Sequence, residues 1–343
     1  MRGLLAATLL GLMWAVTSPL GSTDIAPQSA STRLMGFALG LYPQEAAERG
    51  WRYPPDLQEV RASGARDILL TPSWVMGDIT SSTMGPDADT PRDADLLATL
   101  EAANRLGLGV SLMPYLRIRE AGEGEWRGSV RPLDPNAWWS EYEDFLRHYA
   151  ALGRGRIKVF VMGSELSSMS GDEWETRWAR LAGELRGLGV ERLAFVANHD
   201  ALDLQAPFEF VDVAGVSAYF PVSGDAERAW QDHATRLERF AAEVARPLVI
   251  FELGFPSRQG ALERPWDHIA GTPVDVEAQA LGYRSATNAL ADVEWLEGLF
   301  FWAWYGEGGP HDRSYSPRGK PAMRSVRAFF EGFGETVDTL DGT

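Results

Sequence analysis

The chain alternates between short apolar runs and longer segments in which apolar residues recur every three or four positions. Such short runs, rich in β-branched and aromatic residues, predict strands. Continuous apolarity, rather than strict alternation, is typical of parallel strands that are covered on both faces. We therefore expect eight buried parallel strands, over residues 34–39, 67–71, 109–115, 157–163, 193–198, 211–218, 248–251 and 298–304.

The segments between these runs carry start signals of helices. Asp134 stands where an N-cap is expected, one residue before a proline, and predicts a helix over residues 136–152. Ser170 and Glu173 have the spacing of a capping box and predict a helix over residues 174–188. Both predicted helices end next to a glycine.

Strand–helix alternation repeated eight times predicts a closed (β/α)8 TIM barrel of the α/β class, in a single domain. We expect this domain to span residues 33–335, with a short tail over residues 336–343. An open, doubly wound sheet is the alternative. The first predicted strand is not followed by a Gly-x-Gly-x-x-Gly turn, which argues against the nucleotide-binding version of that fold.

The N-terminus resembles a targeting segment. An apolar run over residues 3–16 follows Met1 and Arg2, and its length is that of a secretory h-region rather than of a membrane span. We interpret residues 1–22 as a signal peptide, or as an N-terminal anchor that is not cleaved, and residues 23–32 as a disordered spacer. We therefore expect a secreted or periplasmic protein without any further integral membrane segment.

Composition narrows the chemistry. A formal net charge of -16 argues against nucleic acid as a partner, because binding phosphate requires a basic surface. The chain has no cysteine, which excludes thiolate nucleophiles and cysteine zinc sites. Only two lysines exist, and the five histidines show no metal-binding spacing, so we expect neither lysine-imine chemistry nor a metal or organic cofactor. We expect the protein to act as a monomer.

Two glutamates follow predicted strands on opposite sides of the barrel. Glu165 comes after the fourth strand and Glu252 directly after the seventh. In a barrel of this type the chemistry lies at the carboxyl ends of the strands, where two carboxyl groups are able to flank a glycosidic bond. We predict that Glu165 is a general acid/base and Glu252 a nucleophile. The alternative for each is a solvated loop charge.

Six further residues at strand ends are candidates for substrate binding. We expect the hydroxyl of Tyr219 to donate a hydrogen bond to Glu252 and to favour its ionised form. The indole of Trp304 is expected to form the floor on which a sugar ring stacks. Asn198 and His199 are expected to bind sugar hydroxyls or to orient Glu165. The remaining two candidates, which would extend the aromatic platform, are Trp74 and Tyr115.

Other charged residues near these ends allow two interpretations. They are either contacts with more distant sugar units or ordinary surface charges: Arg117, Arg119, Asp312 and Lys320. The long segment over residues 256–275, which contains Trp266, is expected to cover or close one end of a cleft.

Five motifs in order at these strand ends resemble glycoside hydrolase family 113. The resemblance implies a retaining barrel hydrolase with the acid/base at Glu165 and the nucleophile at Glu252, supported by Tyr219 and Trp304. It also implies a polysaccharide or oligosaccharide substrate with β-1,4 linkages, with mannan or glucomannan first. The motifs span residues 163–166, 197–200, 213–221, 252–258, and 301–306 with 317–321.

Two alternatives stay open beside the mannanase interpretation. One is hydrolysis of another β-linked polymer such as chitosan, because Ser164 stands where related hydrolases carry an asparagine that contacts the 2-hydroxyl of the sugar. The other is a non-catalytic glycan-binding barrel of the cell envelope, since a fold by itself does not imply an activity.

Overall fold

A computed structural model describes residues 33–203, 206–267 and 271–335 of the chain. The predicted signal peptide or anchor, the spacer and the C-terminal tail lie outside the described residues. Their boundaries therefore stay predictions.

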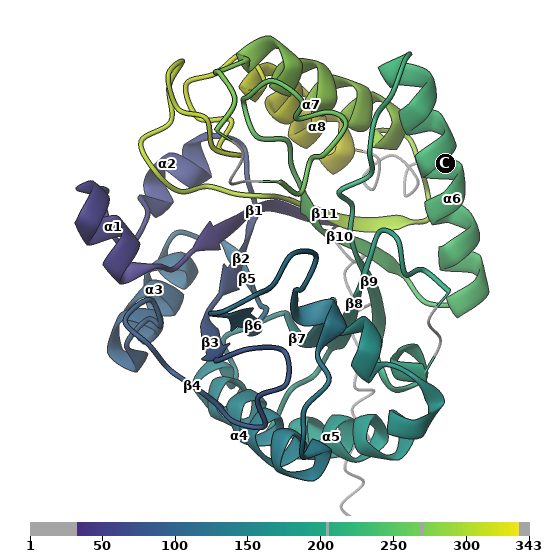
Figure 1. Cartoon of the computed structure of the whole chain (residues 1–343). Helices are drawn as coiled ribbons and strands as arrows, with labels where there is room; N and C mark the ends of the chain where they lie inside the picture. Colours follow the sequence, from purple (N-terminus) through teal and green to yellow (C-terminus); the bar gives the residue numbers. More distant parts are fainter. Residues whose placement is uncertain (1–32, 204–205, 268–270, 336–343) are drawn as a thin grey trace, which may run out of the picture. The chain divides into compact units, whose positions relative to one another are not determined.

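Eight parallel strands close into a barrel, as predicted (Figure 1). Strand β1 pairs with β11 on one side and with β2 on the other, which completes the closure. Around the barrel the order is β1 (Leu34–Gly40), β11 (Leu296–Phe301), β10 (Leu248–Leu253), β9 (Val213–Ser217), β8 (Leu193–Asn198), β7 (Val159–Ser164), β5 (Gly109–Leu112) and β2 (Asp67–Thr71). The fold is a (β/α)8 barrel, and the open-sheet alternative is wrong.

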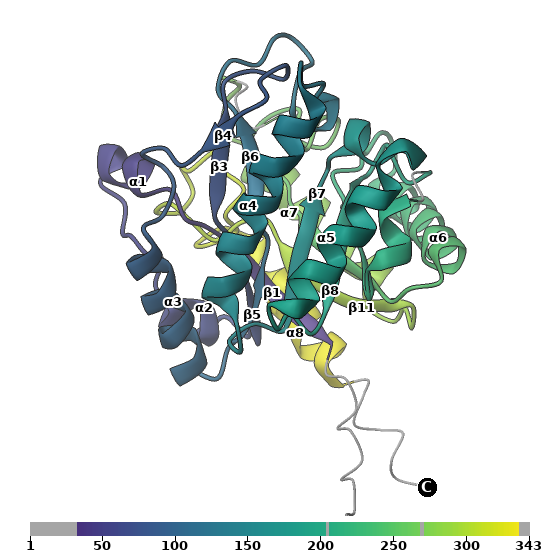
Figure 2. The same ribbon diagram turned by 90° about the horizontal axis from the view of Figure 1, so that it is seen from below.

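A second, small sheet extends from the carboxyl ends of two barrel strands. It contains β4 (Met84–Gly85), β3 (Ser73–Met76) and β6 (Tyr115–Ile118), in that order. Figure 2 shows these three strands together at one end of the barrel. The predicted third strand over residues 109–115 is therefore wrong at its end. It stops at Leu112, and Pro114, which has no N–H to donate, separates it from β6.

The helices surround the barrel (Figures 1 and 2). They are α1 (Pro43–Arg49), α2 (Leu57–Ala62), α3 (Asp93–Arg105), α4 (Pro135–Gly153), α5 (Glu175–Gly187), α6 (Ala226–Val244), α7 (Val276–Leu290) and α8 (Met323–Glu335). In the part of the chain that the structure describes, none of them is both long enough and apolar enough to span a membrane.

One of the two predicted helix starts is confirmed. Asp134 caps α4, and its Oδ1 accepts hydrogen bonds from the amides of Asn136 and Ala137 at 3.0 and 3.1 Å. The predicted capping box at Ser170 is wrong, because the Ser170 hydroxyl donates to the carbonyl of Leu166 at 2.7 Å instead. A 3-10 turn over Asp172–Trp174 then leads into α5.

Two apolar clusters fill the molecule, one inside the barrel and one between barrel and helices. The interior cluster contains alternate strand residues such as Ala38, Val161 and Phe300, with Trp302 and Tyr305 packed against it. The outer cluster contains their neighbours along the strands, such as Phe37 and Phe301, which face the helices. This alternation decides which side chains at the strand ends reach the barrel mouth.

Candidate active site

The backbone is irregular where each of the two glutamates leaves the barrel. Glu165 directly follows β7 and has a φ of 56°, a left-handed conformation that costs a residue with a side chain about 1 kcal/mol or more. Its amide donates to the carbonyl of Val196 in β8 at 2.8 Å, which holds the conformation. In β10 the pairing register shifts between Ile250 and Glu252. Phe251 points into the barrel, so in a regular strand the next residue, Glu252, would point outward. The irregular pairing changes the direction of the side chain, and Glu252 therefore faces the barrel mouth.

Both glutamates are buried and share a single cation. Glu165 is 5% exposed and Glu252 is 2% exposed. Nη2 of Arg127 lies 2.6 Å from Oε2 of Glu165 and 4.0 Å from Oε1 of Glu252. The guanidinium of Arg127 also lies over the ring of Tyr115, with 5.1 Å between its central carbon and the ring centroid. The structure thus brings together the two carboxyl groups on which the predicted site depends.

Tyr219 lies where the sequence predicts it. Its hydroxyl donates a hydrogen bond to Oε2 of Glu252 at 2.8 Å. Burial and then the nearby charge of Glu165 raise the pKa of Glu252 to about 7, whereas Arg127 and the Tyr219 hydrogen bond act in the opposite direction. Burial and the neighbouring carboxylate of Glu252 raise the pKa of Tyr219 well above its ordinary value, so this residue stays a hydrogen-bond donor.

The tryptophan at the barrel mouth is Trp302 rather than the predicted Trp304. Trp304 is 4% exposed and packs against Phe37 with 4.8 Å between ring centroids, on the outer side of the strands. Trp302 is half-buried and packs on the interior cluster, at the end of the strand next to β10. The structure therefore contradicts a floor formed by Trp304. In a regular strand, Trp302 and Trp304 would lie on the same side, because side chains alternate. The chain leaves regular pairing after Phe301, so the two tryptophans point to different sides.

Of the two predicted aromatic extensions, only one lies beside the glutamates. Tyr115 is buried under Arg127, and its hydroxyl is hydrogen-bonded to the hydroxyl of Tyr42. Trp74 packs against α4, with 5.1 Å between its ring centroid and that of Phe145 and 6.1 Å to that of His148. Trp74 is thus a packing partner of α4, and its role in substrate binding stays a prediction.

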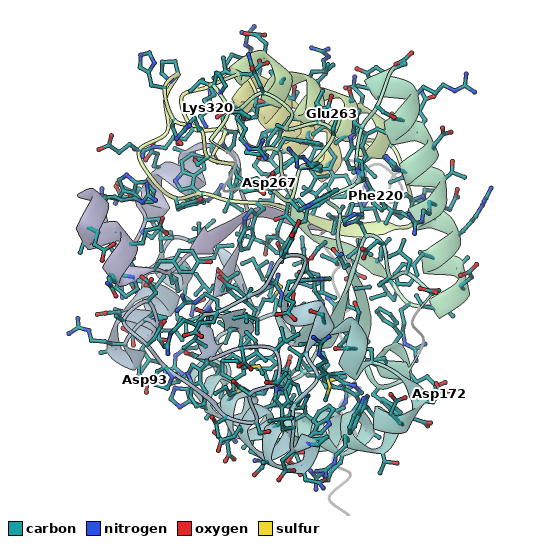
Figure 3. All side chains as sticks on the ribbon, in the orientation of Figure 1. Asp93, Asp172, Phe220, Glu263, Asp267 and Lys320 are labelled. Carbon is teal, nitrogen blue, oxygen red and sulfur yellow. The ribbon has the colours of Figure 1, made fainter. Side chains whose placement is uncertain are left out.

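A cluster of aromatic rings surrounds His199, which directly follows β8. Asn198 is satisfied locally, because its amide donates to Oδ1 of Asp200 at 2.6 Å and its carbonyl oxygen lies 3.1 Å from Nδ1 of His199. The His199 ring stacks on Trp266, with 5.4 Å between centroids, and packs edge-on against Phe220, which Figure 3 labels. Burial lowers the pKa of His199, so its ring is neutral at physiological pH. Trp266, 44% exposed, offers an open aromatic surface in the predicted covering segment.

Three of the four other charged candidates have structural partners. Arg117 is ion-paired with Asp87 and donates from Nε to the Ser73 hydroxyl at 2.9 Å. Lys320 is buried among the loops beside α7 and α8 (Figure 3) and donates to the Ser257 hydroxyl at 2.7 Å.

Asp312 is held in the same loops as Lys320. It accepts hydrogen bonds from the backbone amide and the hydroxyl of Ser314, and it lies 3.7 Å from Nζ of Lys320. Arg119, the fourth candidate, is exposed.

The site contains the groups that acid/base and nucleophilic catalysis on a glycosidic bond require. Two buried carboxyl groups face one cation at the carboxyl ends of parallel barrel strands, a tyrosine donates to one of them, and a tryptophan follows the neighbouring strand β11. Within the described ranges, no group of three or more histidine, aspartate or glutamate side chains is placed to hold a metal ion. Fold and site together define the class: a barrel glycoside hydrolase.

Comparison with known proteins gives the family. The sequence model of Glycoside Hydrolase Family 113 matches residues 40–319, which is most of the chain. The chain belongs to this family and is a mannanase-like glycoside hydrolase. None of the curated proteins matches it.

Solved structures support the fold. The GH113 β-mannanase AaManA from Alicyclobacillus acidocaldarius, solved with ManMIm, superposes with a TM-score of 0.75 at 24% identity, covering 88% of this chain and 98% of that one. A GH113 β-1,4-mannanase superposes with a TM-score of 0.76 at 21% identity, over 87% and 99% of the two chains. Fungal β-1,4-galactanases are more distant, with a TM-score of 0.58 at 14% identity over 87% and 99%.

Sequence reasoning missed two residues of this site. Alternation from the interior residue Phe300 favours Trp302 and Trp304 equally, and only the end of regular pairing after Phe301 separates the two. Arg127 gives no comparable signal, because a single arginine in a glycine-containing loop has the appearance of a surface charge. Only the folded chain shows that the short 3-10 turn η1 (Arg127–Ser129) delivers it to the glutamates.

Proposed function

We propose that this protein is a retaining endo-β-1,4-mannanase that acts on mannan or glucomannan, with Glu165 as general acid/base and Glu252 as nucleophile. The observation that carries the proposal is that one Arg127 nitrogen lies within 4.0 Å of both carboxyl groups. The distances of 2.6 and 4.0 Å from this nitrogen place the two oxygens no farther apart than about 6.6 Å, at the lower end of the range for inverting enzymes. The short gap supports direct attack by a carboxylate, because an inverting pair must leave room for a water molecule.

In the first step, ionised Glu252 attacks the anomeric carbon while protonated Glu165 gives its proton to the departing glycosidic oxygen. A covalent glycosyl–enzyme bond forms and the glycosidic bond breaks. Tyr219 donates a hydrogen bond to Oε2 of Glu252, so we assign the attack to the other carboxylate oxygen, Oε1.

In the second step, Glu165, now ionised, removes a proton from water as the water attacks the same carbon. The bond to Glu252 breaks and the sugar leaves with its configuration retained. Trp302 is the aromatic face on which the reacting sugar stacks. Neither step calls for a metal or an organic cofactor.

The choice of mannan is supported by the names of the similar structures, two of which are described as β-mannanases. Endo action is supported by the aromatic stack of His199 and Trp266, which offers a surface for sugar units beyond the one that reacts.

The test is release of reducing ends from β-mannan, glucomannan, chitosan and cellulose by the purified protein, beside Glu252→Ala. Activity on mannan or glucomannan that disappears in the variant supports the proposal. Activity on chitosan alone overturns the substrate, and silence on all four polymers with intact folding favours a glycan-binding barrel. NMR of the first product distinguishes a retaining from an inverting reaction.

We also propose that residues 1–22 direct export, so that the enzyme works outside the cytoplasm as a monomer. The apolar run over residues 3–16 supports this. Fractionation of expressing cells, mass spectrometry of the mature N-terminus and light scattering test export, cleavage and monomeric state in turn. Recovery of the intact chain in the cytoplasmic fraction would exclude export.

A further inference from the structure

Hydrogen bonds within and around the turn η1 fix the position of Arg127. The Ser129 hydroxyl donates to the carbonyl of Trp126 at 2.9 Å and accepts from its amide at 3.1 Å, which closes the turn η1. Gly128 has no side chain because a Cβ there would lie 2.3 Å from the Trp126 ring. The turn is also tied to the loop of Glu165, since the Ser168 hydroxyl donates to the carbonyl of Val130 at 2.6 Å. Arg127 and Glu165 are thus placed by one connected unit.

The guanidinium makes one of two available contacts. It is hydrogen-bonded to Glu165 at 2.6 Å and is 4.0 Å from Oε1 of Glu252. Oε1 of Glu252 and Nε of Arg127 are both buried and have no well-formed hydrogen bond among the described residues, although the Ser217 hydroxyl is near enough to lower the pKa of Glu252. Unpaired buried polar atoms are costly, particularly when they belong to charged groups. A shift of about 1 Å brings the cation into hydrogen-bond range of the second carboxylate.

The chemistry of the first step opposes the contact that is observed. A carboxyl group that donates a proton to the glycosidic oxygen must be neutral, whereas a guanidinium favours the ionised form of the carboxylate that it touches. Conversely, a nucleophile must be ionised, and burial opposes this for Glu252. The same cation therefore hinders catalysis when it holds Glu165 and assists it when it holds Glu252.

We propose that Arg127 is a positioning residue that moves from Glu165 to Glu252 when the glycan enters, and so decides which of the two glutamates carries the proton. In the free enzyme Glu165 is ionised against Arg127 and the single proton of the pair is on Glu252. In the substrate complex that proton is on Glu165, and Arg127 faces ionised Glu252. The number of protons is unchanged, and the Tyr115 ring supports the guanidinium in both positions. The kinetic part of this proposal rests on the proposed function.

Six titratable groups lie around the guanidinium, and its two glutamate partners are among them. Glu165, Glu252, Tyr115 and Tyr219 act on Arg127 directly. His199 responds to Glu165, and Tyr315 responds to Glu252. The tyrosines stay neutral, because burial raises the pKa of each of them. Burial lowers the pKa of His199, whereas burial and the charge of Glu165 raise the pKa of Glu252 to about 7.

The first test is the pH profile of kcat/KM on mannohexaose for the full chain and for Arg127→Met, Arg127→Lys and Arg131→Met. Arg131 is a matched control, because it lies in the same loop and pairs with Glu125. We expect both limbs of the profile to move by about one pH unit or more to higher pH in Arg127→Met, to stay near the wild-type position in Arg127→Lys, and to stay unchanged in Arg131→Met. A lower maximum with unmoved limbs in Arg127→Met indicates a purely structural role and overturns the proposal.

A second test needs no substrate, so it separates failure of this inference from failure of the mannanase assignment. The glutamate carboxyl carbons are labelled with 13C, and the signal absent in Glu252→Gln is followed by NMR as pH changes. In Glu165→Gln, which imitates a neutral acid, we expect Glu252 to titrate at lower pH than in the wild type. We expect the decrease to be clearly smaller when Arg127→Met is added. A decrease of equal size with and without Arg127 shows that the cation does not move to Glu252 and overturns the proposal.

Discussion

The hydroxyl of Tyr219 lies 2.8 Å from Oε2 of Glu252 and donates a hydrogen bond to it. The tyrosine is the second residue after the end of β9 and the glutamate is in β10, and the two strands are neighbours in the barrel. The contact is thus fixed by the sheet rather than by a loop. It opposes the effect of burial, which makes ionisation of Glu252 unfavourable.

Replacing Tyr219 by Phe removes this hydrogen bond and leaves the ring in place. We expect kcat/KM to fall about 10- to 100-fold, since a hydrogen bond to a charged group contributes about 1.5–3 kcal/mol. The acid limb of the pH profile is expected to move to higher pH, because the ionised form of Glu252 loses a donor. A reduced rate with an unmoved acid limb would show that the hydroxyl does not act through Glu252.

Burial of Glu252 has a consequence for stability. Its pKa is raised from an ordinary value of 4.5 to about 7 in the folded protein, so the stability present below the unfolded value is lost as pH rises through about 7. Glu252→Gln, which is always neutral, is expected to be more stable than the wild type at pH 8, on the order of 1–3 kcal/mol. At pH 4.5 the difference is expected to be small. Thermal melts at the two pH values check this, and equal differences at both would contradict it.

The two tryptophans after β11 are expected to respond in opposite ways to replacement by Ala. Trp302→Ala removes an aromatic face at the barrel mouth and is expected to lower kcat/KM about tenfold or more with little loss of stability. Trp304→Ala opens a cavity against Phe37 and is expected to cost about 3–5 kcal/mol of stability. Parallel melts and kinetics distinguish the two roles. The reverse pattern would restore Trp304 as the sugar platform.

Much of the fold could be predicted because buried parallel strands leave a simple trace, a continuous apolar run between helical segments. The prediction failed at the end of the third run, where the apolar residues continue through Tyr115 but the barrel strand ends at Leu112. A proline in a run breaks the ladder, and Pro114 was a usable signal for that break.

The candidate site was partly predictable for a similar reason. Glu165, Glu252 and Tyr219 follow directly from strand ends, and strand ends converge in a barrel. Arg127 does not, because its place depends on how a turn outside the barrel strands packs over the mouth. Trp302 could not be separated from Trp304 in the sequence, because regular alternation puts both on one side and the end of regular pairing after Phe301 leaves no sequence signal.

Lys320, which was a candidate for substrate contact, is expected to matter for stability instead. Its ammonium group donates to the Ser257 hydroxyl at 2.7 Å and to the carbonyl of Ser314 at 3.0 Å, and burial lowers its pKa to about 8. Lys320→Met leaves these buried acceptors without a donor, so we expect a loss of about 1–3 kcal/mol in the free energy of unfolding at pH 7.

Arg324→Met is the control for this loss, because it removes a positive charge from an exposed position in α8 and is expected to change stability by no more than about 0.5 kcal/mol. Denaturant unfolding of both variants measures the difference. The loops that Lys320 joins follow β10, which contains Glu252, and β11, which directly precedes Trp302. We therefore expect activity at low temperature to be largely kept in Lys320→Met and to be lost at a lower temperature than in the wild type. A variant of full stability with a raised KM would instead place Lys320 in contact with the glycan.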